Sequence, residues 1–286
     1  MHFFLKLLVV TILTSLSWSS AAFDPNKHEQ ITKQAFALYD VCQRHYPNKL
    51  KLTFGTQDKD QITRATHDID NPTIARLVNW HFFDKKYDHI NDRPGNIPVM
   101  FGFIHRSLHH YFLAAHERIK NKLAKSKTAN INKEVGELMH FIQDMAVPAH
   151  VTPIFHMFGY SDPLDAYQPK TPITPNINSS TCEKLIAEHK NPVDLLLSSA
   201  HNTLGVIDAK QTSQRWHHYW QPSSKSTNNS GFGEYGTCGR AGFGKTNDAP
   251  CNKTNEEYNA FYAKQYHQAV IDSIRLLFHM SRIVTP

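Results

Sequence analysis

The segment VGELMHFIQDMAVPAH, residues 135–150, carries the strongest fold signal in the chain. Its apolar side chains recur at helical spacing, which predicts a helix with one buried face, at Val135, Leu138, Met139, Ile142 and Met145. Proline lacks a backbone N–H and cannot continue a helix, so Pro148 predicts the end of this one.

Other parts of the chain show the same period. Apolar stripes predict helices at Ile31–Leu38, over 101–123 with Phe101 and Ile104 in its first turns, and over 255–283. Segments 163–180 and 221–253 are rich in Pro, Gly, Ser, Thr and Asn, which indicates loops, and the second is long enough for a lid or a binding loop. Strict alternation is scarce, so we expect an all-α fold, a single multi-helix bundle over residues 23–286.

The N-terminus has the pattern of an export signal. Phe3–Leu16 is largely apolar but too short to span a bilayer, and small residues follow it, so residues 1–22 are predicted to be a signal peptide. Cleavage would release Phe23 as the mature terminus, with Trp18 as the second choice. Export to an oxidising compartment lets the four cysteines form two disulfides, and the three possible pairings stay open. We therefore expect a secreted protein, or a periplasmic one in transit.

Composition narrows the function classes only partly. The chain has 286 residues, of which 40% are hydrophobic and 20% are charged. This composition excludes a disordered or a collagen-like protein. The net charge of +6 suits a polyanionic surface, either anionic lipid or nucleic acid. The 19 histidines matter more, because histidine is the commonest metal ligand.

The predicted helix of the opening segment carries a candidate pair of metal ligands. His140 and Asp144 are four residues apart and therefore project from one helix face. His150 follows beyond Pro148 and can approach the same ion or a neighbouring one. Further His and Asp clusters occur around His28, at Asp68 with Asp70, and at His81 with Asp84. Nitrogen and oxygen ligands of this kind suit zinc.

Taken in order, these motifs resemble the secreted zinc-dependent phospholipases C of bacteria. The resemblance covers residues 23–165 and rests on an aromatic mature terminus ahead of His28 and on four later stretches: Asp68-x-Asp70-Asn71-Pro72, His81-Phe82-Phe83-Asp84, His140-x3-Asp144-x5-His150, and a following His and acidic residue. It implies an all-α bundle of that family's type with three zinc ions.

The resemblance also implies a ligand set. The freed amine and carbonyl of Phe23 would hold one ion together with His28. A second ion would be held by Asp68, His81 and His140, with Asp144 bridging the two. His150 would begin the third site, and Asp68 would also orient or deprotonate the nucleophile. The family's usual final His-x3-Glu pair is missing, so His156 and Asp165 are assigned in its place, with Asp162 as the alternative.

The implied activity is hydrolysis of the glycerol-side phosphodiester of phospholipids such as phosphatidylcholine or phosphatidylglycerol, giving diacylglycerol and a phosphorylated head group. We expect a monomer that acts on a membrane surface and needs no stable protein partner.

Two alternatives stay open. A zinc-dependent single-strand nuclease of the same fold shares the His-x3-Asp-x5-His spacing, but those nucleases tend to end it in Gln-Pro-Leu-His, where this chain has Val147-Pro148-Ala149-His150. Nucleic acid would be a partner only in that case. The other alternative is a non-catalytic exported protein that binds metal or membranes through scattered histidines such as His109, His217 and His279.

Overall fold

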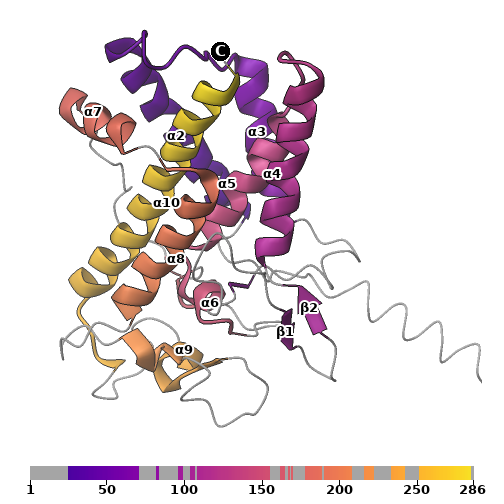
Figure 1. The fold of residues 1–286 in the computed structure, drawn as a ribbon. Helices are drawn as coiled ribbons and strands as arrows, with labels where there is room; N and C mark the ends of the chain where they lie inside the picture. The colour runs from indigo at the N-terminus through magenta and orange to yellow at the C-terminus, as the bar shows by residue number, and fades with distance from the viewer. Residues whose placement is uncertain are drawn as a thin grey trace, which may run out of the picture.

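The computed structural model is predominantly α-helical, as the sequence predicts (Figure 1). It describes residues 25–70, 82–83, 96–98, 104–106, 108–154, 162–164, 167, 169, 178–188, 190–207, 216–221, 233–241 and 251–284. The main helices are α2 (Pro25–His45), α3 (Thr56–Asp68), α4 (Leu108–Lys125), α5 (Asn132–Asp144), α8 (Pro192–Ile207) and α10 (Asn255–Val284). The shorter helical segments are α6 (Pro148–Val151), α7 (Ser179–Ala187), α9 (Thr237–Ala241) and η4 (Trp216–His218).

Helix α5 lies in the middle of the bundle, between α4 and α10 in Figure 1. It packs against α3, α4, α8 and α10, and nearly every residue along it is buried. The buried face of a helix is normally apolar. Helix α5 differs, because its polar residues His140, Gln143 and Asp144 lie fully inside the protein. The bundle therefore buries polar chemistry at its centre.

The structure corrects three sequence predictions. The helix expected over 101–123 begins at Leu108, because Ile104–Arg106 forms strand β2 and pairs antiparallel with β1 (Asn96–Pro98). Helix α5 ends at Asp144, and Pro148 opens α6, where its missing N–H costs no hydrogen bond. Segment 221–253 is not wholly a loop, since it contains β4 (Glu234–Tyr235), which pairs with β3 (Trp220–Gln221), and α9.

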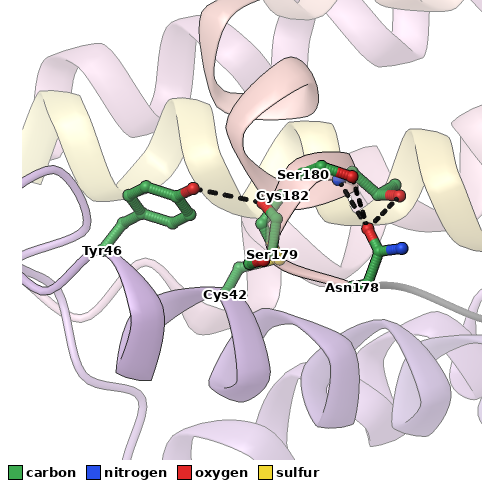
Figure 2. The surroundings of a disulfide bond; sticks show 7 residues. Cys42, Tyr46, Asn178, Ser179, Ser180 and Cys182 are labelled. Atoms are coloured by element: carbon green, nitrogen blue, oxygen red, sulfur yellow. Dashed lines mark hydrogen bonds between the residues drawn. A yellow bond between two sulfur atoms is a disulfide. The ribbon is translucent and has the colours of Figure 1, made fainter.

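The four cysteines form two disulfides, Cys42–Cys182 and Cys238–Cys251. The first ties α2 to α7, and Figure 2 shows the Tyr46 hydroxyl donating to the Ser179 carbonyl beside it. The Asn178 side chain caps α7 by accepting from the Thr181 N–H at 3.0 Å.

Two disulfides indicate an oxidising compartment. None of the helices in the described part of the chain combines the length and hydrophobicity that a membrane span requires.

Helices α3 and α5 approach closely at Gly136. A Cβ atom there would lie 2.4 Å from the Ala65 Cβ and 2.7 Å from the Ile62 carbonyl oxygen. Only glycine therefore fits at this crossing without moving the backbone of α3. His140 lies one helical turn further along α5, on the same face.

Replacing Gly136 with alanine is expected to destabilise the fold by about 1–3 kcal/mol, because the clash with backbone outweighs the better helix propensity of alanine. The matched control is Gly205→Ala in α8, where a Cβ would meet nothing within 4 Å. That variant should be slightly more stable than the wild type, by up to about 1 kcal/mol. Urea unfolding of both variants would measure the difference, and equal effects would contradict the close approach.

Candidate metal centre

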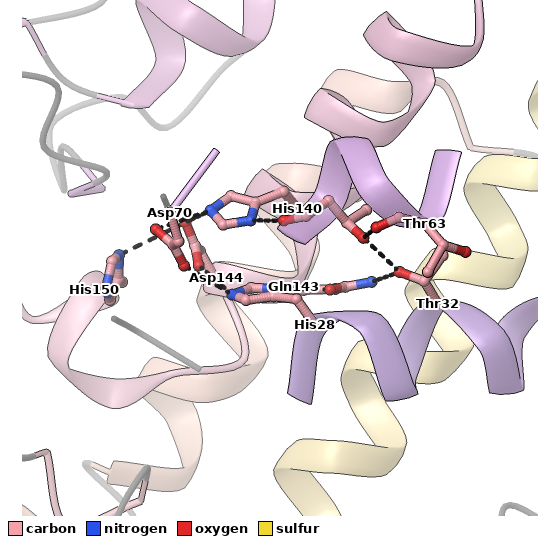
Figure 3. A network of polar contacts seen from close by, with 9 residues as sticks. His28, Thr32, Thr63, Asp70, His140, Gln143, Asp144 and His150 are labelled. Carbon is pink, nitrogen blue, oxygen red and sulfur yellow. Dashed lines mark hydrogen bonds and ion pairs between the residues drawn. The ribbon is translucent and has the colours of Figure 1, made fainter. Parts of the chain in front are cut away.

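Two histidines and two aspartates converge on one buried point, and a third histidine borders it (Figure 3). His28 comes from the first turn of α2, and Asp70 from the turn that follows α3. His140 and Asp144 project from the last turns of α5, and His150 from α6. All five residues are at most 5% exposed. The helical bundle thus gathers separate segments of chain around one position.

The distances in this cluster match the spacing of ligands around a metal ion. Asp144 Oδ1 lies 3.4 Å from His28 Nε2, and Asp144 Oδ2 lies 3.3 Å from His140 Nε2. The Asp70 oxygens lie 3.6 and 3.7 Å from the same two nitrogens. These separations are longer than charge-assisted hydrogen bonds. Ligand atoms about 2.0–2.1 Å from a tetrahedral zinc lie roughly 3.3 Å from one another.

The donor chemistry fits a metal ion as well. His140 Nδ1 lies 2.8 Å from the Thr66 carbonyl oxygen, which can only accept, so Nδ1 carries the proton. In its neutral form the ring therefore turns its Nε2 lone pair to the carboxylates, as metal-bound histidines do. The two imidazoles stack with ring centroids 4.1 Å apart. Asp70 and Asp144 supply two negative charges, which one divalent cation balances. The described residues His28, His140 and Asp144 could therefore hold a metal ion, with Asp70 as a further donor.

Burial and neighbouring charges give His28 and His140 different pKa values. Burial lowers the pKa of His28 to about 4, with help from the adjacent His140, although Asp144 and Asp70 oppose this. Burial also lowers the pKa of His140, but the carboxylates of Asp144 and Asp70 outweigh it and raise this pKa to about 9. At neutral pH the metal-free cluster therefore keeps one proton more than two neutral imidazole rings would carry, and this proton lies on His140 Nε2.

A metal ion must displace that proton, so metal binding is expected to depend on pH. Below pH 9 the free protein keeps the His140 proton, and lowering the pH therefore favours the metal-free form. Zinc should release about one proton per chain near neutral pH, and its affinity should rise about tenfold per pH unit up to pH 9. Calorimetric titrations in buffers of different ionisation enthalpy count this proton. Zinc binding without proton release near neutral pH would show that His140 is neutral in the free protein.

The structure brings together three of the predicted ligands and corrects a fourth. His28, His140 and Asp144 meet, and His150 Nδ1 lies 3.9 Å from Asp144 Oδ2. Asp68, predicted as both ligand and catalytic group, does not join them. Its side chain is 62% exposed and pairs with His67.

Asp70 takes the position that was predicted for Asp68. Ile62, Thr66 and Asp70 follow one another at intervals of four residues, and all are buried on the inner side of α3 and its final turn. Asp68 is two residues from Thr66, and this offset turns it to the opposite side of the helix. The period of four is visible in the sequence and could have identified Asp70. The Thr66 carbonyl, which accepts from His140 Nδ1, and the Gln143 amide oxygen, which lies 2.7 Å from His28 Nδ1, have no comparable sequence signal.

Several predicted ligands lie outside the described residues: Phe23, His81, His156 and Asp165. Phe82 and Phe83, which follow His81, lie beside His150, since the Phe83 N–H donates to the His150 carbonyl at 3.0 Å. The alternative ligand Asp162 has another use. Its carboxylate accepts hydrogen bonds from Trp220 Nε1, the Tyr235 hydroxyl and the Leu164 N–H.

No family model matches the chain, and no curated protein or solved structure matches it. What the site can do is therefore judged from its own residues.

Proposed function

We propose that this protein is a secreted zinc-dependent phosphodiester hydrolase, and that its reaction is that of a phospholipase C. The observation that carries the proposal is the buried convergence of His28, His140 and Asp144, with Asp70 beside them. Such a set is costly to bury without a cation, and its imidazole and carboxylate donors are those that zinc prefers. The paired cysteines support export.

Each residue of the cluster has a role under this proposal. His28, His140, Asp144 and Asp70 would hold one zinc ion. His150, whose Nδ1 lies 3.9 Å from Asp144 Oδ2, would begin a neighbouring site, as the resemblance implies. A zinc cluster lowers the pKa of bound water to about 7 and neutralises charge on a phosphodiester. Asp70, which is buried beside both histidines, would accept a proton from the nucleophile in place of the exposed Asp68. The histidines must be neutral to ligate, so activity should fall in acid.

The choice of phospholipid over nucleic acid as substrate rests on the motifs of the sequence. The Asp68-x-Asp70-Asn71-Pro72 turn resembles the phospholipases, and Val147-Pro148-Ala149-His150 departs from the ending usual in the nucleases. The resemblance also implies three zinc ions in all.

The purified mature protein should release phosphorylated head group from vesicles of phosphatidylcholine or phosphatidylglycerol. A zinc chelator should abolish this release, and added zinc should restore it. Single-stranded DNA is the competing substrate. Cleavage of DNA without lipid hydrolysis would overturn the phospholipase assignment, while full activity in protein stripped of metal would overturn the metal mechanism.

A further inference from the structure

A chain of buried hydrogen bonds connects the outer nitrogen of His28 to the backbone of α3. His28 Nδ1 lies 2.7 Å from Gln143 Oε1, and Gln143 Nε2 lies 3.0 Å from the Thr32 hydroxyl. The Thr32 hydroxyl lies 3.3 Å from the Thr66 hydroxyl, which lies 2.7 Å from the Thr63 carbonyl oxygen. Figure 3 shows this chain running away from the carboxylates. Gln143, Thr32 and Thr66 are all fully buried.

The chemistry of these groups fixes the direction of every bond in the chain. The Thr63 carbonyl can only accept, so the single hydroxyl proton of Thr66 is used there. Thr66 must then accept the proton of Thr32, and Thr32 must accept from the amide NH₂ of Gln143. The amide oxygen of Gln143 consequently faces His28, and an amide oxygen can only accept. His28 Nδ1 must therefore carry the ring proton.

We propose that this chain makes Gln143 a positioning residue of the metal site, which holds His28 as the Nδ1–H tautomer with Nε2 turned to the carboxylates. Thr66, the last hydroxyl of the chain, also accepts a hydrogen bond from His140 Nδ1 through its backbone carbonyl. One buried network thus orients both imidazole rings before any ion binds. The inference rests on the proposed metal site and is independent of the substrate.

The direct test is zinc affinity in Gln143→Met, measured by competition with a chromophoric chelator. Methionine has similar volume but offers no strong acceptor, so zinc affinity should fall roughly 10–100-fold. Gln143→Glu keeps an acceptor at His28 Nδ1, and its affinity should stay within about threefold of the wild type or increase.

The matched control is Gln265→Met. Gln265 is 2% exposed, and its amide nitrogen donates to the Ala146 carbonyl and the Thr203 hydroxyl without contacting either histidine. This variant undergoes the same chemical change, and it should lose stability while keeping zinc affinity. Equal zinc affinities in Gln143→Met and Gln265→Met would overturn the proposal.

A second readout needs neither zinc nor activity. Long-range ¹H–¹⁵N spectra of metal-free protein at neutral pH report which nitrogen of His28 is protonated. The wild type and Gln143→Glu should show the Nδ1–H tautomer, and Gln143→Met should show a mixture. A wild-type Nε2–H tautomer would overturn the inference. If the wild type binds no zinc, the proposed function fails, and the His28 tautomer alone still decides whether Gln143 positions this ring.

Discussion

Replacing Asp144 with asparagine is expected to abolish both zinc binding and hydrolysis. Asp144 is fully buried, and its two oxygens face His28 Nε2 at 3.4 Å and His140 Nε2 at 3.3 Å. Asparagine removes the negative charge and puts an NH₂ group in place of one donor atom. The loss of zinc affinity should exceed the roughly 10–100-fold that changes outside the ligand shell cause. Metal analysis of the purified variant and vesicle hydrolysis would measure both effects.

Asp68→Asn is the matched control for this change. The resemblance to zinc phospholipases C implies that Asp68 is a ligand, whereas its exposed side chain lies outside the cluster. Asp68→Asn should therefore keep its zinc and nearly all of its activity, and Asp70→Asn should lose both. Loss of zinc in Asp68→Asn would contradict the assignment of Asp70, and retained zinc in Asp144→Asn would remove the proposed centre.

Removing the Cys42–Cys182 disulfide is expected to have the largest effect on stability. This bond joins residues 140 positions apart and fastens α7 to α2, the helix that carries His28. In the chain-entropy account, closing so long a loop stabilises the folded state by about 5 kcal/mol. The double variant Cys42→Ala/Cys182→Ala should lose most of that stability, which guanidinium unfolding would measure.

The second disulfide supplies the comparison for the first. Cys238 and Cys251 are 13 positions apart, and the same account gives about 3 kcal/mol for their loop. Cys238→Ala/Cys251→Ala should therefore be the milder double variant. It should also keep full zinc affinity, because none of the cluster residues belongs to that loop. A larger loss from the shorter loop would show that packing, and not loop length, governs these bonds.

Local patterns predicted the elements whose structure depends on neighbours within a turn or two. The stripe of Val135–Met145 identified α5, and a helical stripe identified α10 within a residue of its ends. The pair His140 and Asp144 followed from the same geometry, because residues four apart share one face of a helix. The helix predicted over 101–123 was placed too early, before Leu108, for the opposite reason. Strand β2 forms because it pairs with β1, and the apolar spacing within one segment carries no information about a partner strand.

The sequence by itself determined the all-α class, the candidate pair on α5 and the suitability of its donors for zinc. Only the tertiary structure decided that Asp70 and not Asp68 faces that pair, that His28 completes it, and that Cys42 pairs with Cys182. Each of these outcomes depends on which side of one helix meets another. Around the cluster, the crossing at Gly136 brings α5 against α3, and the contact between Gln143 and His28 joins α5 to α2. Both join residues far apart in the chain.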